Sequence, residues 1–130
     1  MSDESTTGIL LFAHGSPVEE ANAGVRALAA KVQEAGPFRY VRAVFLEDGR
    51  PDLPTGVAEA AQAGLPRVIV VPYFLTDGLH VRRDLPKLIA AAKEAHPGME
   101  ITVGKSLEGN AMMPGLILGI GQEALRSVRG

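Results

Sequence analysis

Cysteine and tryptophan are absent from this chain of 130 residues, and aromatic side chains make up only 5% of it. Without cysteine there is no disulfide bond, no zinc or iron–sulfur centre held by thiolates, and no cysteine nucleophile. A strong charge of one sign is also missing, since the formal net charge is −2 at pH 7, and this argues against nucleic acid or an anionic membrane as a partner. No apolar run approaches the roughly 18 residues that cross a membrane.

The N-terminal segment lacks the features of a leader. Residues 1–7 are acidic and polar, with neither the basic start nor the apolar stretch of a secretory signal peptide, and we expect them to form a flexible arm. No linker or low-complexity tract interrupts residues 8–130, so we expect this stretch to fold as a single domain. Together these features favour a cytoplasmic protein.

Apolar, strand-like runs alternate with helix-like segments along the chain. The strand-like runs are residues 8–13, 38–46, 67–74 and 99–103. The helix-like segments are residues 16–36, 52–63, 84–95 and 111–128. Such an alternation with short connections predicts right-handed crossovers and an α/β fold, in which a parallel four-stranded sheet carries helices on both faces.

Polar residues mark where the helices are expected to begin. Glu19 stands three residues after Ser16, which is the pattern of a capping box at the start of the first helix. Asp52 or Thr55 is expected to cap the second helix, and Asp84 the third.

Two histidines stand just beyond strand-like runs, on turns that contain glycine. His14 follows residues 8–13, and His80 follows residues 67–74. Ligands of parallel sheets bind beyond the carboxyl ends of the strands, which lie at one edge. The loops expected at this edge are residues 14–16, 47–50, 76–83 and 105–110. Because Glu47 opens the second loop, we expect His14, His80 and Glu47 to converge.

These three side chains have the chemistry of a metal or proton-transfer site. Imidazole nitrogen and carboxylate oxygen suit divalent iron, cobalt, nickel or zinc, and three such ligands leave coordination positions open. Neutral imidazole also accepts a proton near pH 7. Taken singly, however, each histidine is more often a turn or capping residue, and a loop glutamate such as Glu47 is usually only solvated. His96 is expected to be structural, because it ends a helix whose C-terminus favours a cationic side chain.

Other chemistries are disfavoured by missing motifs. The chain contains neither a P-loop nor a dinucleotide-binding glycine fingerprint. It lacks Gly-x-Ser-x-Gly, and Ser16 is already assigned to a helix cap, which argues against a serine hydrolase. Ser16 nevertheless lies at a helix N-terminus, where anions are stabilised. Arg82 and Arg83 are either ordinary solvated charges or groups that hold substrate carboxylates.

Three stretches of the sequence carry a family resemblance. They are ILLFAHGS at residues 9–16, VFLE at residues 44–47, and VPYFLTDGLHVRRDLP at residues 71–86, with Asn22 and Pro51 between them. The chain resembles the sirohydrochlorin cobaltochelatase family of class II tetrapyrrole chelatases, in its small, single-domain form. The resemblance covers about residues 8 to 105. Beyond them, the family's His-Pro near the last helix is replaced by residues 108–114.

The resemblance implies a flavodoxin-like, chelatase-like fold and a lyase of cobalamin and porphyrin biosynthesis. It implies ATP-independent insertion of Co²⁺, Fe²⁺ or Ni²⁺ into sirohydrochlorin or a related modified tetrapyrrole, with no cofactor beyond that metal. His14 and His80 would bind the metal, and Glu47 would act with them in catalysis. We assign substrate binding to four further residues. They are Ser16, Gly78, Arg82 and Arg83.

The resemblance also implies a homodimer that binds the macrocycle between its subunits, with no nucleic-acid or membrane partner. The apolar, glycine-containing helix around residues 116–121 either contributes to that interface or covers the sheet. Two alternatives remain open at this point. The protein could carry a metal or tetrapyrrole without catalysis, or it could be an interaction module that keeps only the fold.

Overall fold

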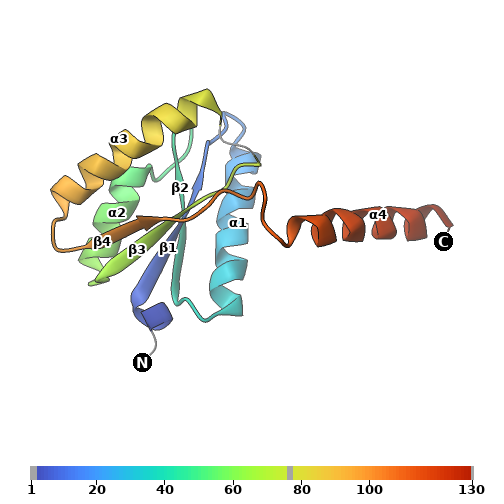
Figure 1. The fold of residues 1–130 in the computed structure, drawn as a ribbon, viewed down its shortest axis with the longest axis horizontal. Helices are drawn as coiled ribbons and strands as arrows, with labels where there is room; N and C mark the ends of the chain where they lie inside the picture. The colour runs from blue at the N-terminus through green and yellow to red at the C-terminus, as the bar shows by residue number, and fades with distance from the viewer. Residues whose placement is uncertain (1–2, 76–77, 130) are drawn as a thin grey trace.

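The computed structural model describes residues 3–75 and 78–129, without the side chains of Leu79 and His80 (Figure 1). Its strands form one sheet with the order β2-β1-β3-β4, and every pairing is parallel. The strands are β1 (Thr7–Ala13), β2 (Tyr40–Phe45), β3 (Arg67–Pro72) and β4 (Glu100–Val103). This confirms the predicted parallel four-stranded sheet. The first strand begins at Thr7, one residue earlier than its predicted start at residue 8, and residues 3–6 form a short 3₁₀ helix.

Helices cover both faces of this sheet, but unequally. They are α1 (Glu19–Ala35), α2 (Leu53–Gln62), α3 (Leu79–Ala95) and α4 (Met113–Arg129). The helix α1 packs on one face, whereas α2 and α3 pack side by side on the other (Figure 1). This arrangement follows from the strand order, because a right-handed crossover that runs from β1 to β2 lies on the opposite face from crossovers that run the other way.

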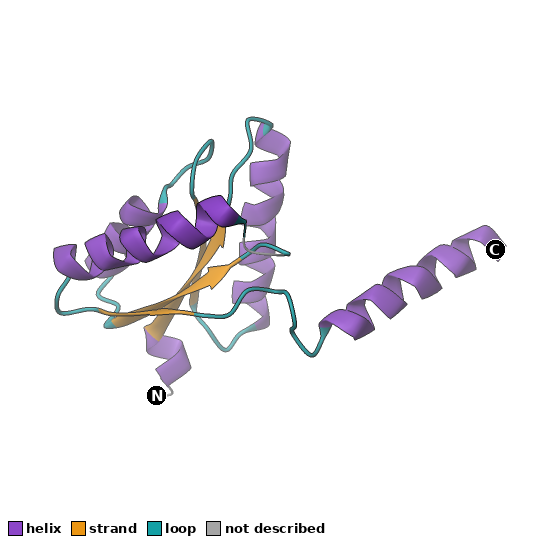
Figure 2. Cartoon of the chain, turned by 45° about the horizontal axis from the view of Figure 1, so that its top comes forward, coloured by secondary structure: helices purple, strands orange, loops and turns teal. Residues whose placement is uncertain are grey.

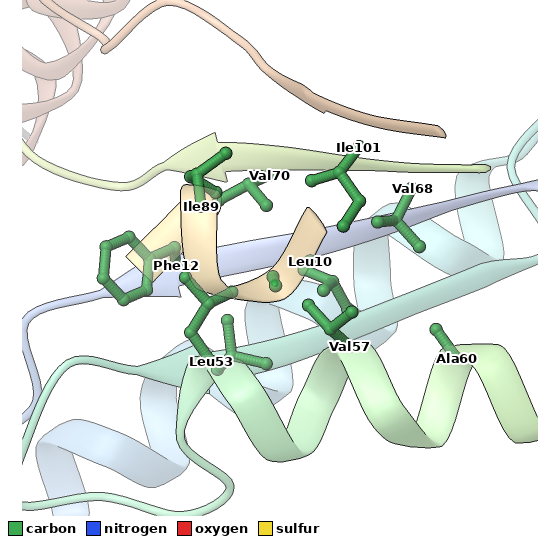
Figure 3. Close-up of a cluster of buried hydrophobic side chains, with 11 residues drawn as sticks. Leu10, Phe12, Leu53, Val57, Ala60, Val68, Val70, Ile89 and Ile101 are labelled. Atoms are coloured by element: carbon green, nitrogen blue, oxygen red, sulfur yellow. The ribbon is translucent and has the colours of Figure 1, made fainter. Parts of the chain in front are cut away.

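The central strand β1 has a buried core on each side. Leu10 and Phe12 lie in the cluster that α2 and α3 cover, where both are fully buried (Figure 3). Leu11 and Ala13 alternate with them and pack against α1. The unbroken apolar run of this strand is therefore explained by burial on both faces.

Two of the predicted helix starts are wrong, and one is confirmed. The first helix begins at Glu19 rather than after Ser16, so these two residues do not form a capping box. The helix α3 begins at Leu79 instead of Asp84, because the N–H of Arg82 bonds the carbonyl of Gly78 and closes an earlier turn. Asp52 does cap α2, since its carboxylate accepts the backbone N–H of Thr55 at 2.9 Å.

The last helix, α4, projects away from the rest of the molecule (Figures 1 and 2). None of its residues is buried, although Leu116, Ile117, Leu118 and Ile120 are apolar. Among the described residues, no helix combines the length and the apolar character that crossing a membrane would take.

Candidate active site

His14 and Glu47 come together because their strands are neighbours in the sheet. The ladder between β1 and β2 continues beyond the strand ends, with Leu46 N–H bonded to Ala13 and Glu47 N–H bonded to the His14 carbonyl, each at 3.0 Å. The His14 Nε2 and Glu47 Oε1 atoms lie 3.5 Å apart, and the side chains are 47% and 52% exposed. This part of the predicted cluster is therefore formed at the carboxyl edge.

Gly15 makes this close approach possible. Its φ of +93° lies in the region that side chains disfavour. A Cβ at this position would stand only 1.6 Å from the carbonyl oxygen of Glu47. Any residue with a side chain would thus have to push the His14 and Glu47 backbones apart.

Asn22 ties together the two loops that carry these side chains. Its Oδ1 accepts the N–H of Ser16 at 2.9 Å, and its Nδ2 donates to the carbonyls of Ser16 and Asp48 at 2.8 and 2.7 Å. The residue is 1% exposed, so these bonds replace water that its amide would otherwise bind. Asn22 therefore fixes the positions of the loops that follow β1 and β2.

The structural role of Asn22 was not predicted, although the sequence contains a signal for it. Asn22 stands four residues after Val18 and three before Val25, which places it on the inner face of the first helix. A polar amide on an inner face needs hydrogen-bond partners, and the adjoining loops are the nearest source of them. Asp48 accepts its bond with a φ of 56°, which aspartate tolerates better than most residues.

Ser16 serves the local turn that precedes α1. Its hydroxyl oxygen accepts the N–H of Val18 at 3.0 Å. Because its backbone is also held by Asn22, Ser16 has a structural role that does not depend on a ligand.

The loop after β3 reaches the same edge of the sheet. The N–H of Tyr73 bonds the carbonyl of Phe12 at 2.7 Å, which carries the pairing of β1 with β3 past its end. Gly78 is the N-cap of α3, and His80 belongs to its first turn. Thr76, Asp77 and the His80 side chain are outside the described part of the structure, so the pairing of the two histidines stays a prediction.

The two arginines assigned to substrate binding are exposed on α3. The Nε of Arg83 lies 3.3 Å from the carboxylate of Asp84, and Arg82 uses its backbone N–H to close the first turn of the helix. Within the described residues, no three histidine or acidic side chains are grouped closely enough to hold a metal ion. Of the three side chains predicted to converge, the described part of the structure therefore brings together His14 and Glu47.

A polar hollow of about 550 Å³ opens beside Glu47. Its acidic lining also includes Glu19, whose pKa is held below its usual range by a hydrogen bond from Arg26 and a second one from Asn22. The Arg26 guanidinium stacks over the Phe45 ring at 5.4 Å from its centre. The surroundings of Glu47 therefore carry both charge signs and are open to water.

Comparison with known protein families shows to which family the chain belongs. The CbiX family model matches residues 8–119, a span that contains all seven residues assigned to the site. The chain belongs to the CbiX family. Its architecture agrees with that of a CbiX protein from Marinobacter aquaeolei, which has 28% sequence identity and a TM-score of 0.82, over 93% of this chain and 98% of that one. The chelatase-like fold is thereby confirmed.

Relatives of this CbiX-family chain include archaeal proteins named sirohydrochlorin cobaltochelatase. The one from Methanopyrus kandleri is 35% identical over 86 residues, which are 66% of this chain and 60% of that protein. The one from Methanocaldococcus jannaschii is 35% identical over 88 residues, 68% of this chain and 62% of that one. The matched region is thus less than two thirds of the length of these relatives.

A larger solved structure is also similar to the CbiX-family chain. The sirohydrochlorin chelatase SirB from Bacillus subtilis, in complex with cobalt, has 29% identity and a TM-score of 0.71. The match covers 77% of this chain and 43% of that one. Another SirB structure, with Fe³⁺, has 27% identity and a TM-score of 0.70.

Proposed function

We propose that this CbiX-family protein inserts Co²⁺, Fe²⁺ or Ni²⁺ into sirohydrochlorin or a closely related modified tetrapyrrole, without ATP. The observation that carries the proposal is the His14–Glu47 pair at the carboxyl edge, with 3.5 Å between Nε2 and Oε1. Relatives named sirohydrochlorin cobaltochelatase support the substrate. SirB structures with Fe³⁺ and with cobalt support the choice of metals.

His14 is suited to bind a metal through Nε2. Its Nδ1 lies 3.3 Å from the Gly15 carbonyl oxygen. A proton on Nδ1 would be donated to that carbonyl, which leaves the lone pair of Nε2 for the metal, as is usual for metal-bound histidine. The Glu47 carboxylate adds an oxygen ligand beside it, and His80 is the proposed third ligand. A set with open positions holds an ion while releasing it more readily than a closed cage of four ligands.

The same pair can take up the protons that the reaction produces. Two pyrrole N–H groups must lose their protons when a divalent metal enters the macrocycle. Neutral His14 can accept a proton on Nε2, and Glu47 at 3.5 Å stabilises the imidazolium that forms. Because both side chains are about half exposed, the proton can leave to water. Metal binding and proton uptake at His14 exclude each other, so the proton follows release of the ion.

The proposal extends to the substrate and the assembly. Gly78, Arg82 and Arg83 at the start of α3, together with Ser16, are assigned to the macrocycle and its carboxylates, because guanidinium groups bind carboxylates well. We also propose a cytoplasmic homodimer that needs no further cofactor and has no nucleic-acid or membrane partner. The exposed apolar side chains of α4 support the homodimer.

The test is an absorbance assay of sirohydrochlorin with Co²⁺ and purified protein. We expect His14→Ala to lower the insertion rate about 100-fold or more, since it removes both a ligand and a proton acceptor. Glu47→Gln should lower it about 10- to 100-fold, as loss of a supporting carboxylate does at metal sites. His96→Ala is the matched control, because His96 ends α3 after its last turn, and its rate should equal that of the unaltered protein.

Equal rates for the unaltered protein and a His14→Ala/His80→Ala double variant would overturn the proposal. Tight binding of Co²⁺ or sirohydrochlorin, measured by calorimetry, without any acceleration over the spontaneous reaction would instead assign the protein to metal or tetrapyrrole delivery.

A further inference from the structure

The strand β3 is buried on one face only. Its neighbours in the sheet are β1 and β4, yet its burial alternates along the chain. Val68 and Val70 are fully buried under α2 and α3, whereas Ile69 and Val71 on the other face are only partly buried. Interior strands of parallel sheets are normally covered on both faces. One apolar face of β3 is therefore only partly covered by the rest of its own chain.

The uncovered area has a definite position. The helix α1 contacts β2 and the adjoining part of β1, and α2 and α3 occupy the opposite face. Among the described residues, no helix lies over β3 and β4 on the α1 side (Figures 1 and 2). We define the open half-face by Ile69, Val71 and Gly104, of which Val71 also packs against the cluster under α1.

Gly104 adds no side chain to the open half-face. A Cβ at Gly104 would lie 3.9 Å from Ile69 Cγ2 and 4.0 Å from Val71 Cγ2. The three residues thus share one surface, and the missing side chain leaves room for another element to approach the backbone closely.

The helix α4 carries an apolar stripe of matching character. Apolar residues recur along it at intervals of three or four, which places them on one side of a helix. They are Met113, Ile117, Ile120, Ala124 and Val128, and we call them the α4 seam. Ile117 is 64% exposed, Ile120 59% and Val128 85%. Gln122 lies on the opposite side of the helix.

The connection between β4 and α4 holds this helix away from its own sheet. The N–H of Asn110 bonds the Leu107 carbonyl at 3.0 Å, and the Asn110 side chain accepts the N–H of Met112 at 2.9 Å. The N–H of Met113 then bonds the Asn110 carbonyl at 3.1 Å. These bonds form a defined turn that starts α4 in its outward direction (Figure 2).

We propose that two copies of this chain exchange α4, so that each seam packs on the open half-face of the other copy. Each chain has one bare face and one bare helix of the same apolar character, and a two-fold exchange covers both at once. Left exposed, both would be unusual for a monomer. This inference rests on the homodimer of the proposed function and states how that homodimer is held together.

The size and charge of α4 also favour a second copy. At 1.5 Å per residue, its 17 residues span about 25 Å. Two such helices, each packed on a sheet, bury an area on the order of the 1,600 Å² of a standard stable interface. The polar side of the helix carries Arg126 and Arg129 but also Glu123, so it lacks the dense basic face of helices that bind anionic membranes.

Cysteine cross-linking tests the exchange directly, because the chain has no cysteine of its own. One chain carries Ile69→Cys, and a differently tagged chain carries a single cysteine at Ile117, Ile120 or Ala124. The two are co-expressed and oxidised. We expect a covalent dimer that contains both tags for at least one seam position. Gln122→Cys on the opposite side of α4 is the matched control and should give none.

Chains that carry both cysteines separate exchange from closure within one chain. We expect Ile69→Cys combined with the reactive seam cysteine to give covalent dimers on a non-reducing gel. A cross-linked monomer would overturn the exchange, because α4 would then lie on its own sheet. The absence of any cross-link from all three seam positions would overturn it as well.

Sedimentation of an Ile120→Glu variant provides a second measurement. We expect the unaltered protein to sediment as a dimer, Ile120→Glu to raise the dimer dissociation constant at least 10-fold, and Gln122→Glu to leave it unchanged. A monomeric unaltered protein would overturn the exchange. Metal insertion is assayed separately by absorbance with His14→Ala, a variant expected to cross-link normally, so that the two proposals can fail independently.

Discussion

The half of the molecule built on β1 and β2 is covered by its own helices on both faces, whereas the half built on β3 and β4 is not. In the first half, α1 and α2 cover both faces, and Asn22 joins the loops that carry His14 and Glu47. In the second half, β3 is fully covered on one face only and α4 stands apart. The contrast indicates that one chain can fix the His14–Glu47 pair alone, while its own helices leave one face of the other half incompletely covered.

The largest expected effect comes from comparing glycines in the two halves. Gly15→Ala should lower the free energy of unfolding by about 4 kcal/mol or more, because a Cβ would overlap the Glu47 backbone and the positive φ adds strain. Gly78→Ala should change it by no more than about 0.5 kcal/mol, because among the described residues no atom beyond its chain neighbours lies within 4 Å of a Cβ there. Urea denaturation followed by circular dichroism measures both.

If Gly15→Ala is too unstable to purify, the loss of soluble Gly15→Ala protein, together with an unchanged yield of soluble Gly78→Ala protein, also agrees with this expectation. Equal stability of the two variants would show that the His14 and Glu47 backbones are not rigidly apposed.

A smaller effect is expected from comparing asparagines in the two halves. Asn22→Ala should destabilise the protein by about 3 kcal/mol, because it removes a buried amide that makes three hydrogen bonds to the Ser16 and Asp48 backbones. Asn110→Ala should cost about 1 kcal/mol or less, since its side chain is exposed and accepts one bond. Denaturation midpoints give the stabilities, and the insertion assay should show the larger loss for Asn22→Ala. Similar losses of stability and insertion rate for the two variants would show that Asn22 does not fix its half of the molecule more firmly than Asn110 fixes the other.

The smallest expected effect concerns the cap of α2. Hydrogen bonds from Thr55, first from its side chain and then from its backbone, hold the pKa of the Asp52 carboxyl below its usual range. A lowered pKa in the folded state adds stability that is present above the unfolded value of about 3.9 and is lost as pH falls through the folded value. Asp52→Ala should therefore cost about 1 kcal/mol at pH 7.

Stability curves at several pH values check this expectation. The difference between the unaltered protein and Asp52→Ala should narrow below about pH 4. Asp52→Asn, which keeps an acceptor without a charge, is the control and should show a smaller loss at pH 7. A difference that stays constant down to pH 2 would contradict the role of the carboxylate.

The strands were predictable from sequence, and so was the meeting of His14 with Glu47. Long apolar runs predicted the bounds of each strand to within about two residues. Parallel pairing brings the carboxyl ends of neighbouring strands to one edge of the sheet, where His14 and Glu47 meet. The bridging role of Asn22 was missed because it depends on a contact with Asp48, far away in the sequence. The start of α3 was misplaced because Asp84 and Pro86 look like a helix N-terminus, whereas the actual cap, Gly78, has no capping side chain.

The direction of α4 was beyond the reach of the sequence. Its apolar stripe fits packing on its own sheet and packing on another copy equally well. The choice depends on the turn at Asn110 and on the bare face of β3, which appear only in three dimensions.

The backbone hydrogen bond between His14 and Glu47 makes the backbone of this pair move much more slowly than its side chains. The backbones of the two residues are locked together and separate only if the sheet opens locally, which is a rare event. Their half-exposed side chains change rotamer within picoseconds to nanoseconds. In the proposed reaction, the two side chains would therefore rearrange around the metal ion faster than loops or domains move, without any motion of the backbone that carries them.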